Sequence, residues 1–477
     1  MASVGWVVSK AACGCRPNSR WPGVGIACAI LGALVTPTPS AAETLQDALV
    51  RTYQTNPQLN AERARQRGTD ENVPQALAGY RPQLVASLSS GLQAVRNVLP
   101  DNTVQSATLK PWTIGLTVTQ VLFNGYRTAN NVRIAEFQVK SGREALRNIE
   151  QGVFLDAVTA YMNVMANYAL VEAQRTNIQV LREIQATTRR RLEAGDVTPT
   201  DTAQAESRVS RGLADLNAAE VAYAISKEIY TQVIGLAPTQ LAAASPVDRL
   251  IPPTQMASIE AASHEHPAVL GAGYDVDVAQ TSIKLAESAL LPQVSVQGSV
   301  SRQFENDPTL TTKQTDQASV VGQINVPIYD GGMAASQTRQ AKEVTSQSRL
   351  VLEQVRNQAH TAAVSAWVSN EGTKVALRAA ESEVKAADIA LQGVRRETQG
   401  GQRTTIDVLN AQQDLTNART RQITAQRDRV IASYTLLSAV GRLDVHTLNL
   451  NTPDYSPHVH YQQVRDAWHG LRTPSGQ

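Results

Sequence analysis

The chain has 477 residues, with 44 basic against 42 acidic residues and only 4% aromatic residues. The nearly balanced charge gives no general reason to expect a nucleic-acid partner. The length would suffice for two or three ordinary domains. With so few aromatic residues, however, it favours long helices packed through small side chains over the thick core of a globular enzyme.

The first 42 residues have the pattern of a secretory signal peptide. Basic residues precede an apolar run from Val24 to Val35, which is too short to span a bilayer as a helix, and the small residues Ser40 to Ala42 follow. We expect export and cleavage after Ala42, with an unprocessed anchor as the alternative. All three cysteines lie in this segment: Cys13, Cys15 and Cys28. The mature chain would therefore have neither disulfides nor thiolate metal sites.

The rest of the chain is a duplication. When Phe123 is placed on Tyr329, the two halves stay in register without a gap as far as Gly235 and Gly441. Further upstream the register shifts by four residues, between paired strands, where a loop can vary in length. We predict a first repeat over 43–235, a linker over 236–256, a second repeat over 257–445 and a poorly ordered C-terminal tail over 446–477.

Each repeat reads as helix, strand, strand, long helix, helix. Apolar and polar residues alternate in two predicted β-hairpins, 82–123 and 292–329. This period fits an ordinary half-buried sheet as well as transmembrane strands. The polar stretches Asn102 to Leu109 and Glu305 to Gln317 would then be extracellular loops. Aromatic residues cluster at the strand ends, where a membrane girdle would lie: Tyr80, Trp112, Phe123, Tyr126, Phe304 and Tyr329.

Long helices decide between these alternatives. They are predicted over 125–193, 199–234, 331–399 and 405–440, and the first would be about 100 Å long. Globular domains do not contain helices of that length. Four strands cannot close a barrel, and lipid does not tolerate open sheet edges, so three chains would supply about twelve strands. The predicted fold class is a mixed α and β membrane protein, whose duplicated unit forms a trimeric 12-stranded β-barrel continued by a long α-barrel.

Each repeat also changes from strand to helix at an unusual junction. Phe123-Asn124-Gly125 in the first repeat recurs as Tyr329-Asp330-Gly331 in the second. Glycine relieves the backbone where the geometry changes. Asn124, Gly125, Asp330 and Gly331 therefore mark the points where each half would leave the membrane barrel and enter the helical one.

The signal peptide, the duplicated layout, the two junctions and the segment GGQRTTIDVLNAQ (Gly400 to Gln412) resemble the TolC family of outer-membrane efflux proteins. The resemblance covers nearly all of 43–445. It implies a homotrimer in the outer membrane of a Gram-negative bacterium, in contact with outer-membrane lipid and extending through the periplasm. Such a trimer passively exports drugs or proteins, in efflux or type I secretion, with a periplasmic adaptor and an inner-membrane transporter. The alternative is an exported helical structural or adhesion protein without channel activity.

Two helix starts carry the candidate site residues. Thr198 and Thr404 fit N-caps, and Asp201 and Asp407 follow three residues later, so capping alone would account for them. The family resemblance implies in addition that Asp407 belongs to an acidic ring at a periplasmic gate and that Asp201 makes a gating contact.

The same resemblance makes Arg403 a gate link and shows two departures. Asn410 stands where some members carry a second aspartate, and Thr398 stands where some carry a gating tyrosine. One ring of negative charge would then be absent and the closed state held differently.

Sequence motifs give no support to catalysis. The chain lacks G-x-S-x-G, a P-loop and H-E-x-x-H. The histidine pairs 264/266 and 458/460 are interpreted as solvated residues of turns and tail rather than metal ligands. We therefore expect no enzyme activity, no cofactor and no metal.

Overall fold

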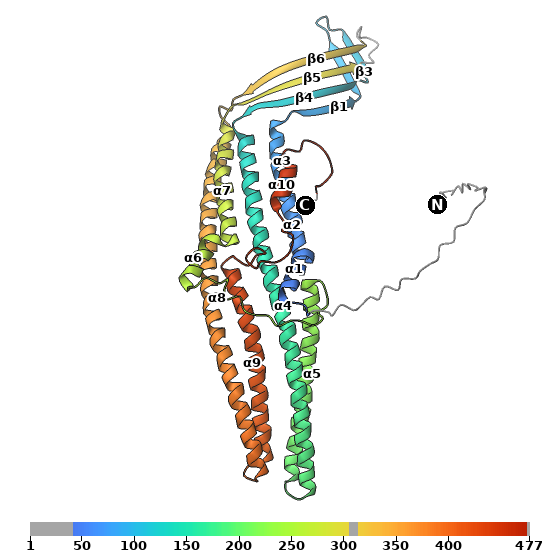
Figure 1. The fold of residues 1–477 in the computed structure, drawn as a ribbon. Coiled ribbons are helices and arrows are strands. Elements are labelled where there is room, and N and C mark those ends of the chain that lie inside the picture. The colour runs from blue at the N-terminus through green and yellow to red at the C-terminus, as the bar shows by residue number, and fades with distance from the viewer. Residues whose placement is uncertain (1–41, 305–312, 475–477) are drawn as a thin grey trace, which may run out of the picture. The chain divides into compact units, whose positions relative to one another are not determined.

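The computed structural model describes residues 42–304 and 313–474 (Figure 1). The predicted signal peptide, up to residue 41, and residues 305–312 of the second expected loop lie outside the described residues. The part from Ala42 onward forms one unit. It is mostly helical, and its described strands form one four-stranded and one two-stranded sheet.

The helix expected at the start of the first repeat is a succession of short helices. They are α1 (Leu45–Thr55), α2 (Pro57–Asp70) and α3 (Asn72–Leu77), followed by a 3-10 turn, Ala78–Tyr80. Asn56 ends α1 and caps α2, whose first residue is Pro57; proline fits a helix start but not a helix interior. The second repeat breaks in the same way at His266, between α6 (Gln255–Glu265) and α7 (Pro267–Glu287).

Two long helical hairpins form the rest of the helical part. Helices α4 (Arg127–Glu193) and α8 (Met333–Gln399) have 67 residues each, about 100 Å. Their partners are α5 (Pro199–Ile234) and α9 (Thr405–Ala439). Helix α4 also packs against α7 and α9, so the two repeats are joined along their length. Among the described helices, none is both long enough and apolar enough to cross a membrane.

The strands lie at the end of this unit remote from the hairpin tips (Figure 1). The main sheet is antiparallel, in the order β1-β4-β5-β6. A separate two-stranded ribbon, β2 with β3, continues the first hairpin beyond Gly91. The strand bounds are β1 Gln83–Ser90, β2 Gln93–Val98, β3 Val104–Leu109, β4 Trp112–Asn124, β5 Gln293–Phe304 and β6 Gln314–Asn325.

Three expectations about the strands were wrong. The first extracellular loop, expected over Asn102 to Leu109, is mostly strand β3, and the turn lies instead at 99–103. The second, expected over Glu305 to Gln317, overlaps strand β6, which begins at Gln314. Strand β6 ends at Asn325, so the expected strand over Val326 to Tyr329 is irregular. Pro327 explains this early end, because proline cannot donate a hydrogen bond to a strand ladder.

The largest apolar core lies where both repeats and the linker meet. Phe154, Tyr161 and Tyr230 are fully buried in it, together with residues of α1 and α9. The Tyr161 hydroxyl lies 2.8 Å from the carbonyl oxygen of Glu43 and 2.6 Å from that of Ala242. Glu43 also forms a parallel bridge with Leu241 in the linker. The start of the described chain and the linker are thereby fixed to the middle of α4.

The C-terminal tail, expected to be poorly ordered, contains helix α10 (Pro457–Val464), which packs against α2. His460 is only 1% exposed, and its Nδ1 lies 3.0 Å from a carboxylate oxygen of Asp70. The interpretation of this histidine as solvated was therefore wrong. His460 and Val464 bury one face of a helix that is too short and too polar for its periodicity to be recognised.

Glu150 on α4 lies beside this core. Its Oε1 accepts a hydrogen bond from the backbone N–H of Val445 at 3.4 Å, and Asp444 and Asp454 lie near it. Burial, aided by repulsion from the two aspartates, raises the pKa of Glu150 from 4.5 to about 7. Between these values the folded chain holds a proton that the unfolded chain has lost. The free energy of unfolding therefore falls as the pH rises through this window.

We expect Glu150→Gln to remove most of this pH dependence, because glutamine does not ionise. At pH 8 the variant should be more stable than the parent chain, by roughly 3 kcal/mol at most. Thermal unfolding of the purified protein between pH 5 and pH 8 measures the effect. Glu183→Gln, an exposed position on the same helix, serves as the control and should leave the pH dependence in place. Parallel pH profiles for the parent and the Glu150 variant would contradict the prediction.

Candidate functional site

The two helical hairpins end in tips of the same construction. Gly195, after α4, and Gly401, after α8, have φ angles of +82° and +76°. The residue after each glycine donates its backbone N–H to a carbonyl oxygen in the last turn of the preceding helix. Asp196 donates to Arg191 and Gln402 donates to Glu397, both at 2.9 Å. This is the Schellman type of helix ending, which needs a residue that tolerates a positive φ.

The helices that leave these tips begin with reciprocal capping boxes. The Thr198 backbone N–H and hydroxyl both donate to Asp201, at 2.9 and 2.8 Å. Thr404 donates to Asp407 in the same way, at 3.0 and 2.8 Å. The backbone N–H bonds, followed by the hydroxyl bonds, lower the pKa of both carboxyl groups. Both tips therefore carry a fully ionised carboxylate at neutral pH.

The other predicted gate residues on α8 and its tip make contacts close to themselves in sequence. Arg403 pairs with Glu397, with 3.0 Å between Nε and Oε2, and both side chains are about half exposed. The Thr398 hydroxyl donates to the carbonyl oxygen of Val394 at 2.7 Å. Neither contact is with a residue of the α4–α5 hairpin, so within one chain they stabilise only the end of α8.

Asn410 makes the contact that joins the tips. Its side-chain oxygen accepts a hydrogen bond from Arg208 of α5 at 2.9 Å. Beside this link, Val209 of α5 and Leu409 of α9 pack in one apolar cluster with Leu181 of α4. Arg208 was missed in the sequence analysis, because nothing local connects it to a residue 202 positions later.

Further from the tips, a buried polar network crosses between the hairpins. The side-chain oxygen of Asn177 accepts hydrogen bonds from Gln412 at 3.1 Å and from Thr416 at 3.0 Å. All three side chains are at least 95% buried. Arg395 of α8 donates to Gln412 at 3.1 Å. The contacts of Asn177 with Gln412 and Thr416 were also missed, since they depend on tertiary packing alone.

The strand-to-helix junctions are helix caps as well as backbone turns. Gly125 and Gly331 have φ angles of +63° and +74°. A Cβ atom on Gly125 would lie 2.6 Å from the carbonyl oxygen of Ser288, so a side chain is excluded there. Asp330 accepts the backbone N–H groups of Gly332 and Ala334, at 2.9 and 2.6 Å. Asn124 accepts the N–H of Thr128 at 3.3 Å.

The four-stranded sheet has one apolar and one polar face. Register places Leu84, Val118, Gly298 and Val320 in one cross-strand row of the apolar face. The next residue of each strand points to the other face, which is rich in Ser, Thr and Gln. The apolar side chains are uncovered: Leu88 is 72% exposed and Val320 is 80% exposed. Among the described strands, the outer edges of β1 and β6 have no partner.

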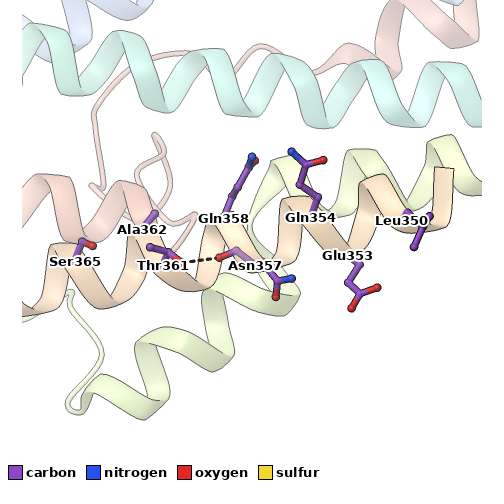
Figure 2. A pocket seen from close by; sticks show the side chains of 8 residues that line it. All are labelled: Leu350, Glu353, Gln354, Asn357, Gln358, Thr361, Ala362 and Ser365. Atoms are coloured by element: carbon purple, nitrogen blue, oxygen red, sulfur yellow. Dashed lines mark hydrogen bonds between the residues drawn. The ribbon is translucent and has the colours of Figure 1, made fainter. Parts of the chain in front are cut away.

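One groove of about 710 Å³ runs along a single face of α8 (Figure 2). Gln354 and Gln358 project to one side and Glu353 to the other, and the Thr361 hydroxyl donates to the carbonyl oxygen of Asn357 at 2.9 Å. Amide and hydroxyl groups on one helix provide neither a nucleophile with a base nor a set of metal ligands. Within 42–304 and 313–474, no three acidic, histidine or cysteine side chains meet as a possible metal site.

Comparisons with known proteins agree with this architecture. A family model described as outer membrane efflux protein matches residues 48–236 and 258–442. The chain is 37% identical over 454 residues to the outer membrane efflux protein BepC of Brucella suis, covering 95% of this chain and 97% of BepC. It is 24% identical over 342 residues to the alkaline protease secretion protein AprF of Pseudomonas aeruginosa, covering 70% of each.

A solved structure supports the fold. The CmeC outer membrane channel of Campylobacter jejuni is similar with a TM-score of 0.73, over 94% of this chain and 98% of CmeC, at 15% identity. The family resemblance inferred from the sequence is thus confirmed. The family model covers well over half of the chain, and the BepC match extends over nearly all of it. The chain belongs to the outer membrane efflux protein family.

Proposed function

We propose that three copies of this chain form an outer-membrane channel that conducts drugs or exported proteins passively out of the cell. The observation that carries the proposal is the sheet, which has one exposed apolar face, one polar face and, among the described strands, two edges without a partner. Exposing the apolar face to water is unfavourable, and placing the unpaired backbone groups of the edges in lipid is unfavourable as well. Three sheets joined edge to edge would avoid both, as a barrel of about twelve strands with lipid outside and a polar lumen inside.

The helical hairpins support the same assembly. Apolar residues remain exposed along α5 and α8, including Val221, Ile225, Val368 and Val375, each more than half exposed. Neighbouring copies packed side by side would cover them and continue the barrel as a helical tube. The tips of the hairpins would form its periplasmic entrance, with three copies of Asp407 around the axis.

The proposed channel implies partner proteins. A passive tube needs an energy source elsewhere, so we propose that an inner-membrane transporter and a periplasmic adaptor act with the trimer. The names of the relatives, one an efflux protein and one a protease secretion protein, support small-molecule efflux and type I secretion as the two cargo classes. The alternative, an exported helical structural or adhesion protein, would use the strands for self-association. Its release from cells as a soluble filament would refute the channel.

An epitope tag in the turn at 99–103 should be reachable by antibody on intact cells, because this turn ends the β2–β3 ribbon furthest from the helices. A tag placed after Asp196, at the tip of the α4–α5 hairpin, is the matched control. It should be labelled only after the outer membrane is breached. The reverse pattern would invert the proposed topology.

Asp407→Ala should relieve block of the reconstituted channel by multivalent cations. Three carboxylates around one axis attract such ions far more strongly than a single exposed charge does. Single-channel conductance with and without the cation measures the block. Asp407→Asn separates charge from capping, since the side-chain oxygen of asparagine can still accept the hydrogen bonds that Thr404 donates. It should relieve the block and leave thermal stability unchanged.

If Asp407 is only a helix cap, its replacement by alanine would lower stability by about 1 kcal/mol and leave the block intact. That result would refute the acidic ring and leave the channel standing. Asn410→Ala is the control for charge, because it lies one turn further along α9 and removes the link to Arg208 without removing a charge. It should change the cation block little.

Arg403→Ser should raise the resting conductance of the closed channel. It would loosen the tip by breaking the link to Glu397 and any contact with a neighbouring copy, while the acidic ring stays in place. Arg421→Ser is the matched control, because Arg421 forms a comparably exposed pair with Glu383 away from the tip. Equal resting conductance in both variants would remove Arg403 from the gate.

A further inference from the structure

The last helix of the chain returns to the first repeat and is held there by a buried contact. His460 and Asp70 are both at least 99% buried, with 3.0 Å between Nδ1 and Oδ2. Gln66 donates to the other oxygen of Asp70 at 3.0 Å and to the carbonyl oxygen of Val139 in α4 at 3.2 Å. One buried carboxylate thus ties α10 to α2, and its partner Gln66 reaches on to α4.

Further contacts hold the same segment along the upper half of α4. Tyr461 packs on the apolar cluster of Val73, Ala135 and Val139. The guanidinium of Arg143 lies 5.1 Å from the centre of the Tyr461 ring. Arg465 lies 3.9 Å from Glu136. Because Val139, Glu136 and Ala135 precede Arg143 on α4, these contacts run along the helix toward the sheet.

The segment ends at the foot of the sheet, by which we mean the end where β1 begins and β4 ends. Arg81 stands two residues before β1, donates to the carbonyl oxygen of Ala467 at 2.7 Å and lies 4.7 Å from the centre of the Trp468 ring. Figure 1 shows the chain rising from α10 toward the strands before it turns away. Trp468 is 68% exposed and Leu471 is fully exposed.

Comparison of the two repeats shows what this end adds. The register that places Pro82 on Pro292 also places Tyr80 on Leu290 and Arg81 on Leu291. The second repeat therefore has two leucines at its sheet foot, both partly exposed. The first repeat has one tyrosine and an arginine, and Trp468 lies over that arginine. The tail thus supplies the apolar side chain that the first repeat lacks at this level.

We propose that residues 457–471, the C-terminal arm, present Trp468 and Leu471 to the periplasmic leaflet of the outer membrane. The inference rests on the proposed barrel, whose foot would lie at that leaflet. Tyr80 precedes β1, and Ile328 and Tyr329 follow β6, so these exposed side chains belong to the same end of the sheet. Tryptophan suits this position because its ring is apolar and its N–H is polar, which favours the boundary between lipid and water. The partner is the lipid surface itself.

Tryptophan fluorescence tests the arm, because three tryptophans remain after residue 42: Trp112, Trp367 and Trp468. Each is kept in turn while the other two are changed to phenylalanine. The trimers are reconstituted in phosphatidylethanolamine and phosphatidylglycerol vesicles, with and without phosphatidylethanolamine brominated on the upper acyl chain. Bromine quenches only indoles that reach the lipid. Trp112 on the apolar sheet face and Trp367 in the helical part are the positive and negative references.

We expect brominated lipid to quench the fluorescence of Trp468 as it quenches that of Trp112, and to leave the fluorescence of Trp367 unchanged. The emission of Trp468 in vesicles should also lie at a shorter wavelength than that of a tryptophan in water. Quenching of Trp112 without Trp468 would overturn the arm and leave the barrel standing. Quenching of neither would refute the barrel as well. In the Trp468 background, His460→Ala should reduce the quenching while trimers persist on unheated gels. Undiminished quenching would show that the buried pair does not position the arm.

Discussion

The sheet imposes the strictest constraint on this molecule. The side chains of its apolar face are exposed, and the outer edges of β1 and β6 are open among the described strands. In water, such edges invite uncontrolled pairing; in lipid, each unpaired backbone group costs several kcal/mol. The sheet of a single chain is therefore unfavourable both in water and in lipid. The proposed closure by two further copies makes the fold of each chain dependent on assembly, and the helices must hold each sheet at an angle that permits closure.

The helices meet this demand through close packing rather than through a thick core. Small residues at equivalent positions of the two repeats, Ala157 with Ala363 and Ala160 with Ala366, are all nearly fully buried. They let long helices approach closely where both repeats meet the linker. Arg429 adds a polar clamp, since its guanidinium bonds to Asp248 in the linker and to Asn370 in α8. These contacts join the two helical hairpins at mid-length, and the Arg208–Asn410 hydrogen bond joins them again near their tips.

Sequence reasoning succeeded where the signal was local. The bounds of α5 agree with the expectation because Thr198, Pro199 and Gly235 mark both ends within a few residues. The break of the first hairpin at Gly91 and the position of its turn were missed, because strand alternation continues across them. The Arg208–Asn410 link and the Asp70–His460 pair were out of reach, since they join residues 202 and 390 positions apart. The assembly of several chains depends on contacts of the same non-local kind, which no pattern within one chain reports.

One difference between the repeats has a mechanical consequence. Tyr126 has a φ of +64° at the step where the second repeat has Gly332. A non-glycine residue in this conformation carries strain of roughly 1–2 kcal/mol, and the Tyr126 ring packs edge-on against Phe123 at 5.3 Å. Gly331 and Gly332 follow an irregular stretch and have far more backbone freedom. The junction between the sheet and the α4–α5 helical hairpin is therefore stiffer than the junction between the sheet and the α8–α9 helical hairpin. We therefore expect bending between strands and helices at the junction of β6 with α8 rather than at the junction of β4 with α4.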